Sequence, residues 1–207
     1  KAEISSSIEE QGKMTDELAK AIQEAKTLVE IEDLYRPYKP KRKTRASIAR
    51  ERGLEPLAVL IMLQDHNTNP QKEAEKFIDV EKEIVDINVA LQGAMDIIAE
   101  DISDDAELRK LLRETVAKHG IITSKASDET AESVYENYYD YSEPVNKIAQ
   151  HRVLALDRGE KENFLKVSVT IPDEMGISLI TNKYAKNDSE CGNLVRLACE
   201  DSYKRLI

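Results

Sequence analysis

The chain has 207 residues and a formal net charge of −10, with 34% charged and 41% hydrophobic residues. Aromatic residues make up only 5%, tryptophan is absent, and seven glycines and six prolines are few for this length. High charge with so few aromatic, glycine and proline residues favours a mostly helical protein over a β-sandwich. The longest apolar run is far shorter than the roughly 18 residues that span a bilayer, so we expect no membrane-spanning segment.

The chain begins without methionine and without the apolar core of a signal peptide. Ile4 and Ile8 lie four residues apart, as in the middle of a helix, and we therefore expect a fragment of a longer protein. Cys191 and Cys199 fall in one predicted helix, about 12 Å apart along its axis, which is beyond disulfide reach. Two unpaired thiols and no export signal predict a cytoplasmic protein.

Capping residues and prolines divide the first part of the chain into short helices. Gly12 ends the first helix, and Thr15 is a good N-cap for a second. A helical turn over residues 31–35 should stop at Pro37, because the residue before proline avoids helical geometry. Residues 38–43 should then be extended and exposed.

A pair of helices is predicted next. Thr44 can cap a helix over residues 45–52, with Gly53 as its left-handed C-terminal residue. Pro56 suits the first turn of the following helix, which should end near Gln64. That helix begins with Glu, Pro, Leu and Ala and offers no Arg, Asn or Gln to base edges, so an αα-hairpin is favoured over a DNA-binding helix-turn-helix.

The middle of the chain predicts three further helices. One opens at Pro70 and reaches Ile78, one covers residues 80–102, and one begins at Asp104 or Asp105 and ends before Gly120. The second is the longest periodic segment, and its apolar residues recur every three or four positions: Ile84, Ile87, Leu91, Met95, Ile98 and Ile102.

The second half of the chain carries the strand signals. Residues 121–132 should form a loop with a short extended entry, and residues 150–158 a short helix capped by Gly159. Residues 164–171 alternate between apolar and polar and predict one strand. Because a strand needs a partner, a second strand lies in residues 121–125, elsewhere in the chain, or beyond it.

Two last helices should begin at Asp173 and Ser189. The sequence therefore predicts a mainly α, multihelical fold of about ten helices, with a small β element near residues 163–171. We expect two parts, a multihelical region over residues 1–143 and a smaller α/β continuation over residues 144–207.

Positive charge is concentrated in one stretch. Residues 36–52 contain eight basic residues and one acid, a net charge of +7, whereas the other 22 basic and 39 acidic residues give −17. The cations could contact phosphates and the tyrosines could stack on bases. These candidate nucleic-acid-binding residues are Tyr35, Tyr38, Lys39, Lys41, Arg42, Lys43, Arg45, Arg50 and Arg52. We favour a surface connector whose charges meet the chain's own acids, because nucleic-acid-binding domains are usually basic overall.

A cluster of four tyrosines follows, made of Tyr135, Tyr138, Tyr139 and Tyr141. Acidic residues lie between and beside them and would repel a phosphate backbone. We therefore expect these rings to pack against helices rather than to stack on bases.

Several segments together resemble one family. Residues 34–58, LYRPYKPKRKTRASIARERGLEPLA, resemble the signature of the Tex family of bacterial transcription-accessory RNA-binding proteins. Four more segments agree in the same order and extend the resemblance over nearly the whole chain: SIEEQGKMT, YYDYSEP, HRVLALDRGE and ACEDSYKRLI.

The resemblance implies the N-terminal multihelical region of a longer protein. Family members continue with a YqgF-type nuclease-like domain, helix-hairpin-helix elements and a C-terminal OB-fold domain to which RNA binding is mainly credited. This implies a non-catalytic helical scaffold, with residues 36–52 as a secondary contact. The implied partners are the other domains of the same protein, RNA or DNA through the full-length protein, and RNA polymerase or other transcription proteins. The alternative is a module for protein–protein interaction only.

A nuclease is the least favoured interpretation. Residues 154–159 resemble the opening strand and acidic residue of a nuclease-like fold, but Asp157 could hold Mg²⁺ only with further carboxylates, and none can be placed. His66, His119 and His151 lack metal-ligand spacing. We therefore predict no catalytic residue, no metal site and no cofactor.

Overall fold

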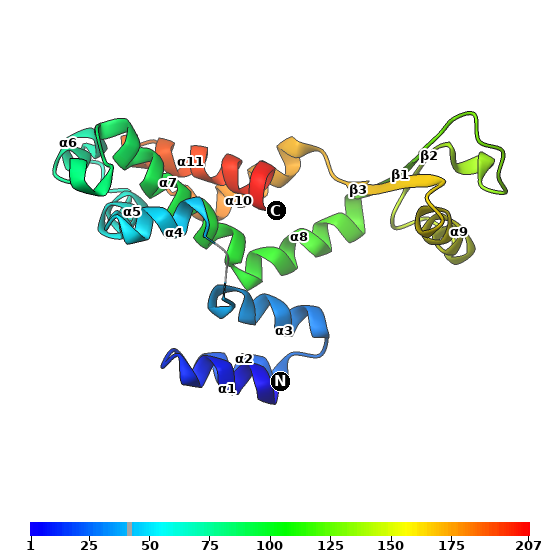
Figure 1. The fold of residues 1–207 in the computed structure, drawn as a ribbon, viewed down its shortest axis with the longest axis horizontal. Coiled ribbons are helices and arrows are strands. Elements are labelled where there is room, and N and C mark those ends of the chain that lie inside the picture. Colours follow the sequence, from blue (N-terminus) through cyan, green and yellow to red (C-terminus); the bar gives the residue numbers. More distant parts are fainter. Residues whose placement is uncertain (41–42) are drawn as a thin grey trace. The chain divides into compact units, whose positions relative to one another are not determined.

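The computed structural model describes residues 1–40 and 43–207 (Figure 1). These residues form two compact units: residues 1–110 together with 177–207, and residues 111–176. The second unit is thus an insertion into the sequence of the first. The expected division into residues 1–143 and 144–207 stays a prediction. The fold is mainly helical with a small antiparallel sheet, which confirms the predicted fold class.

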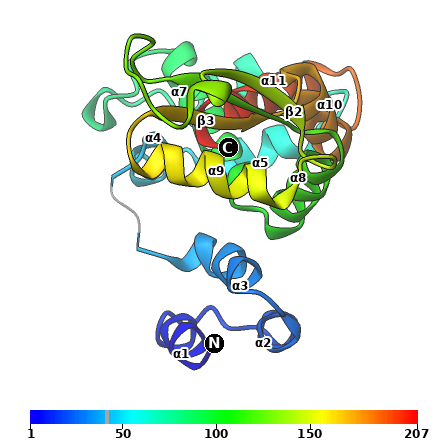
Figure 2. The same ribbon diagram turned by 90° about the vertical axis from the view of Figure 1, so that its right-hand side faces the viewer.

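The first unit begins with three short helices, α1 (Ala2–Glu10), α2 (Asp16–Glu24) and α3 (Leu28–Tyr35) (Figure 2). As predicted, Gly12 is left-handed with φ +66°, and the Thr15 hydroxyl accepts a hydrogen bond from the Leu18 N–H. Helix α3 is longer than the predicted turn, because Thr27 and Glu30 form a capping box at its start.

The chain after α3 differs from the prediction. Arg36–Tyr38 form a 3₁₀ turn, η1, so Pro37 continues the helical path and Tyr38 is not extended. Proline fits the first positions of such a turn because its missing N–H has no partner there. Lys39 is exposed and has extended backbone, as predicted.

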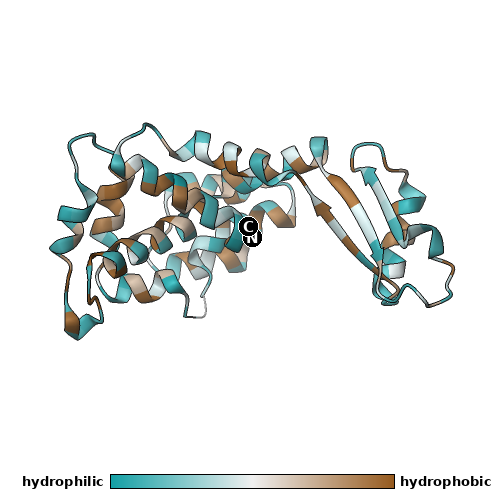
Figure 3. Ribbon diagram, turned by 90° about the horizontal axis from the view of Figure 1, so that it is seen from above, coloured by the Kyte–Doolittle hydropathy of each residue, from teal (hydrophilic) through white to brown (hydrophobic). Residues whose placement is uncertain are grey.

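Helix α7 (Ile87–Asp104) is the central element of the first unit. The elements packed on it include α4 (Arg45–Glu51), α5 (Glu55–Leu63), α6 (Pro70–Glu75), α11 (Glu190–Asp201) and the π-helical turn η4 (Ser202–Leu206). Its buried apolar residues are mostly alanines and isoleucines: Ala90, Leu91, Ala94, Ile97, Ile98, Ala99 and Ile102. Apolar and polar stretches alternate along these helices, as expected for helices that bury one face (Figure 3).

Helix α7 begins later than predicted, and α6 ends earlier. Residues Val80–Lys82 form the 3₁₀ turn η2, Glu83 is left-handed with φ 60°, and Ile84 pairs with Asp79 in an isolated antiparallel bridge. The carboxylate of Asp79 accepts the N–H groups of η2, and that of Asp86 caps α7. Side chains that bind nearby backbone in this way compete with a continuous helix, and apolar spacing alone does not reveal them.

Gln64 joins α5 to the loop before α11. It is left-handed with φ 55° and is buried. Its Nε2 donates to the Tyr184 carbonyl at 2.8 Å, and its Oε1 accepts from the Lys186 N–H at 2.7 Å. Its own carbonyl accepts from Asn187 Nδ2 at 2.8 Å. Ser189 then caps α11, as predicted.

Helices α8 (Ala106–His119) and α10 (Asp173–Tyr184) each cross from one unit to the other. Asp105 precedes α8 and accepts from the Leu108 N–H, as predicted for a capping residue. Cys191 and Cys199 are both buried in α11 as free thiols. Within the described part of the chain, no helix is both long and apolar enough to cross a membrane.

The second unit contains a three-stranded antiparallel sheet and one complete α-helix. Strands β1 (Ile121–Ala126), β2 (Asp140–Pro144) and β3 (Leu165–Thr170) lie in the order β2-β1-β3. The predicted strand is therefore paired, and its partner β1 lies where one of the alternatives placed it, at residues 121–125. β2 was not predicted.

The core of the second unit contains the tyrosine cluster. Tyr135 is buried with Ile122, Leu156 and Leu165, and the other three rings pack around them. Packing of the tyrosines is thus confirmed. Helix α9 (Gln150–Lys161) runs past Gly159, so the predicted glycine cap is wrong. Gly159 lies against Leu165, and the left-handed residue after α9 is Asn163, with φ 62°.

Candidate functional site

Helix α7 carries three buried acids on one face. Asp96, Glu100 and Asp104 follow at intervals of four residues, so their side chains lie one above another along the helix. Each residue is no more than 8% exposed. We call these three residues the acidic face of α7.

Each acid contacts an arginine from a different element. Arg36 Nε of η1 donates to Asp104 Oδ1 at 3.0 Å, and Arg50 Nη1 of α4 donates to Glu100 Oε2 at 2.8 Å. Arg205 Nη2 of η4 lies 3.4 Å from Asp96 Oδ1. The acidic face therefore ties three separate elements to the central helix.

Burying these charged acids costs free energy, which their contacts with arginines offset. Burial raises the pKa of Asp96, although hydrogen bonding from Gln92 and the charge of Arg205 act in the opposite direction. Taking ions out of water can cost as much as their attraction returns, so such pairs contribute little net stability while intact. Losing one partner leaves a buried charge, so the pairs penalise any other arrangement of α4, η1 and η4 around α7.

Four of the predicted nucleic-acid-binding residues are half-buried and make internal contacts. Besides Glu100, Arg50 forms ion pairs with Asp101 and Glu55. Arg52 forms an ion pair with Glu83.

The two tyrosines of this stretch hold the chain next to α1. The Tyr35 hydroxyl is 3.1 Å from Ser7 Oγ, and the Tyr38 carbonyl accepts from Gln11 Nε2 at 3.0 Å. Both rings are only partly accessible. Their contacts, like those of Arg50 and Arg52, serve the fold.

Three other predicted residues are exposed: Lys39, Lys43 and Arg45. Lys43 Nζ lies 3.2 Å from Glu51, but both side chains are more than 60% exposed, and pairs of this kind add little stability. Lys41 and Arg42 lie outside the described residues. The accessible charge of the stretch is therefore confined, among the described residues, to 39–45.

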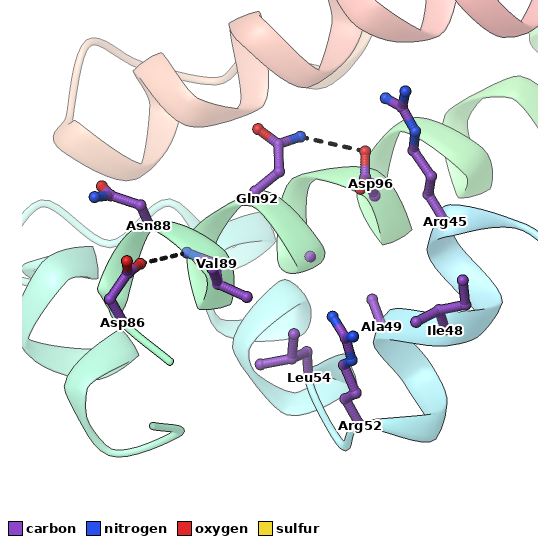
Figure 4. A pocket seen from close by; sticks show the side chains of 11 residues that line it. Arg45, Ile48, Ala49, Arg52, Leu54, Asp86, Asn88, Val89, Gln92 and Asp96 are labelled. Carbon is purple, nitrogen blue, oxygen red and sulfur yellow. Dashed lines mark hydrogen bonds between the residues drawn. The ribbon is translucent and has the colours of Figure 1, made fainter. Parts of the chain in front are cut away.

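A groove of about 500 Å³ runs between α4 and α7 (Figure 4). Arg45 of α4 and Arg52, which follows α4, line one side, and Asn88, Gln92 and Asp96 of α7 line the other. The floor is apolar and is made of Ile48, Ala49, Leu54, Val89 and Gly93. We call this feature the α4–α7 groove.

The structure gives no support to a nuclease site at Asp157. Residues 154–159 lie in helix α9, in agreement with the helix predicted over residues 150–158, and not in a strand like the first strand of a nuclease-like fold. Asp157 is exposed and forms an ion pair with Lys161 one turn away at 2.8 Å. No group of three His, Cys, Asp or Glu side chains among residues 1–40 and 43–207 could hold a metal ion.

Sequence reasoning missed the acidic face of α7 and the α4–α7 groove. The acidic face had a signal, because acids at intervals of four inside an apolar helix must be buried or must interrupt the stripe. The groove had none, because it depends on Gly93, whose role appears only where α4 meets α7. A Cβ at position 93 would lie 2.4 Å from Leu54 Cδ1 and 3.3 Å from the Cβ of Ala49.

Comparison with known proteins shows the family. The family model described as Tex central region-like matches residues 65–199, more than half of the chain. The chain therefore belongs to the Tex family. The name of the model assigns the matched residues to the central region of Tex proteins, whereas the resemblance of the sequence alone implied the N-terminal region.

Three relatives illustrate the range of similarity. The chain is 43% identical over its whole length to the uncharacterized protein YdcI of Bacillus subtilis, and 38% identical over 86% of its length to the transcriptional accessory protein Tex of Neisseria gonorrhoeae. It is 28% identical over 97% of its length to S1 RNA-binding domain-containing protein 1 of Homo sapiens. These matches cover 29%, 24% and 21% of the respective relatives, so the chain spans less than a third of each.

Proposed function

We propose that this chain is a non-catalytic helical scaffold within a Tex-type transcription-accessory protein. The observation that carries the proposal is the acidic face of α7, where arginines from η1, α4 and η4 are held by one central helix. Such contacts position these elements around α7. Membership of the Tex family and the name of the Neisseria relative support the transcriptional role.

A second part of the proposal is an auxiliary contact with RNA or DNA through the cations of residues 39–45. Lys39, Lys43 and Arg45 are exposed, whereas Arg36, Arg50 and Arg52 already contact acids. The contact would be electrostatic and independent of base sequence. The name of the human relative, which mentions RNA binding, supports RNA as the partner to test first.

Charge reversal tests the auxiliary contact. A K39E/K43E/R45E variant should lose at least tenfold in affinity for a single-stranded RNA 20-mer at low salt. A matched K20E/K72E/K118E variant changes the net charge equally at exposed lysines elsewhere and should bind as the unmodified chain does. If both variants bind the RNA as tightly as the unmodified chain, the auxiliary contact is wrong and only the scaffold role remains.

RNA polymerase and other transcription proteins are further proposed partners of the intact protein in the cytoplasm. A pull-down with purified RNA polymerase tests this separately. Retention of polymerase by the chain in high salt, with RNA digested, would support a direct contact. Loss of polymerase on RNA digestion would assign the association to RNA.

A further inference from the structure

A tight hairpin joins α6 to α7. Asp79 and Ile84 exchange both backbone hydrogen bonds, at 3.0 and 2.9 Å, and the chain turns between them through η2 and the left-handed Glu83. Ile84 is only 1% exposed and holds the turn against the first unit. We call residues 78–85 the 78–85 hairpin. Because its backbone is closed by its own hydrogen bonds, a partner would not have to order it on binding.

Three aliphatic side chains of the 78–85 hairpin are exposed to solvent. Val80 is 74% exposed, Val85 60% and Ile78 42%. Successive side chains of an extended chain point to opposite faces, so Val85 points away from the face on which Ile84 is buried. Single exposed aliphatic residues are ordinary on a protein surface, but a group of them in one short turn indicates a contact surface.

The charge around these side chains is negative. Residues 72–86 contain three bases and six acids, a net charge of −3, and a further cation contributed by Arg52 brings it to −2. Three of the cations are held in ion pairs with acids: Lys76–Glu73, Lys82–Asp79 and Arg52–Glu83. The exposed Lys72 and Glu75 of α6 offset each other in the count. The two acids that remain are Glu81 and Asp86, and within residues 1–40 and 43–207 neither forms an ion pair.

These two acids lie next to the exposed valines in the sequence. Glu81 follows Val80 and Asp86 follows Val85, and both acids are exposed. Asp86 caps α7 by accepting from the Val89 N–H at 2.9 Å, and the positive end of the helix dipole offsets part of its charge. The carboxylate of Glu81 accepts no hydrogen bond from the described residues. The hairpin therefore presents aliphatic side chains beside an uncompensated carboxylate.

We propose that the 78–85 hairpin docks a protein partner whose contact surface combines apolar side chains with Lys or Arg. The apolar side chains of the partner would cover Val80 and Val85, and one of its cations would meet Glu81. Covering the valines supplies affinity, because it removes apolar surface from water. The opposite charge selects partners of the right sign and speeds their encounter.

Other occupants fit this surface less well. A second copy of the chain, brought hairpin to hairpin, would place two Glu81 carboxylates together, and like charges across an interface are unfavourable. Nucleic acid and anionic lipid would be repelled by the same carboxylates. The inference is independent of the proposed RNA contact, because that contact uses the cations of residues 39–45 and none of the 78–85 hairpin.

A subtractive peptide selection tests the inference. A phage library of random peptides is first absorbed on the V80S/V85S variant of the 207-residue chain, which removes peptides that any acidic surface attracts. The remaining phage are then selected on the unmodified chain. We expect enrichment of peptides that place an aliphatic or aromatic residue near Lys or Arg.

Fluorescein-labelled copies of the selected peptides should bind about tenfold more weakly to V80S/V85S and to E81K. Two matched controls should bind them with unchanged affinity. V59S/L63S removes two exposed aliphatic side chains of α5, and E129K makes the same charge change at an exposed acid of the second unit.

Three results would overturn the inference. One is a selection that enriches no peptide, or only peptides without an apolar residue. Another is unchanged peptide affinity in E81K, an exposed-site variant that should melt at the same temperature as the unmodified chain. The third is a dimer in sedimentation equilibrium that V80S/V85S abolishes, because the hairpin would then contact a second copy of the chain.

Discussion

Arg50 of α4 and Glu100 of α7 form a hydrogen-bonded ion pair at 2.8 Å, although 50 residues separate them in the sequence. Arg50 is one of the candidate nucleic-acid-binding residues of the basic stretch, and Glu100 lies in the middle of the central helix. In the structure this arginine makes a contact within the fold. Arg36 and Arg205 repeat the arrangement one turn away on either side of Glu100.

A double-mutant cycle tests that assignment. Arg50→Met should lower the free energy of unfolding by about 3 kcal/mol, because it removes a cation that is hydrogen-bonded to the buried carboxylate of Glu100. The double variant R50M/E100L should lose clearly less unfolding free energy than the sum of the losses in the two single variants, because it removes both charges. Urea unfolding followed by circular dichroism measures all three. Additive losses would show that Arg50 and Glu100 do not depend on each other.

Gln64 should be one of the most sensitive polar residues. Gln64→Ala leaves the Tyr184 carbonyl and the Lys186 N–H without their partners, and we expect a loss of about 2–3 kcal/mol in unfolding free energy. Gln64→Gly removes the same contacts but suits the left-handed backbone, so it should cost about 1 kcal/mol less than alanine. Thermal unfolding of both variants measures this difference in stability. A larger loss of stability for Gln64→Gly than for Gln64→Ala would contradict the role of the left-handed backbone.

Asp105 should make stability depend on pH. Burial raises its pKa, but hydrogen bonds from Lys183, Tyr184 and the Leu108 N–H outweigh this and hold the pKa below its usual value of 3.8. A carboxyl group whose pKa is lower in the folded state than in the unfolded state stabilises the folded state at any pH above the unfolded pKa. This stabilisation is lost as the pH falls through the folded pKa.

The matched variant is Asp105→Asn. We expect it to be less stable than the unmodified chain at pH 7 by about 1–2 kcal/mol, from the loss of charged hydrogen bonds. The difference should shrink as the pH falls below about 4. Urea midpoints from pH 7 to pH 3 measure it. A difference that stays constant over this range would show that the charge of Asp105 contributes nothing.

Substitutions at Gly159 and Asn163 distinguish the effect of packing from the effect of helix capping at the end of α9. A Cβ at position 159 would lie 2.5 Å from Leu165 Cδ1, so Gly159→Ala should cost about 1–3 kcal/mol through overpacking. Asn163→Gly should be neutral or slightly stabilising, because Asn163 is left-handed. Melting temperatures of the two variants give the comparison. A stabilising G159A would instead favour the helix propensity of alanine over the close contact.

Local features of the fold were predictable because neighbouring residues determine them. Thr15, Thr44 and Ser189 each cap a helix through a backbone N–H only three residues away. The alternation over residues 164–171 likewise identified β3 without knowledge of its partner. β2 was missed because it is short and polar, with Tyr141 between Asp140 and Ser142, and only pairing with β1 makes it a strand.

The candidate site was less predictable because it depends on contacts between distant segments. Charge counting located residues 36–52 but could not show which arginines meet acids some 50 residues away or more. The start of α7 was misplaced because Ile84 and Ile87 continue the apolar spacing, while the carboxylates of Asp79 and Asp86 determine the turn between them. The groove depends on the close packing of Ala49 in α4 against Gly93 in α7, and the sequence of neither helix alone predicts that contact.

The salt dependence of RNA binding shows how many cations of the basic stretch contact phosphates. Fluorescence anisotropy with a labelled single-stranded RNA, at several salt concentrations, gives the slope of log affinity against log salt. If only the five cations of residues 39–45 can meet phosphates, the slope should be no steeper than about −3.5. A slope near −5.6 would mean that all eight cations of residues 36–52 contact the strand, which contradicts the engagement of Arg36 and Arg50 by acids of α7. No binding at low salt would contradict the nucleic-acid contact itself.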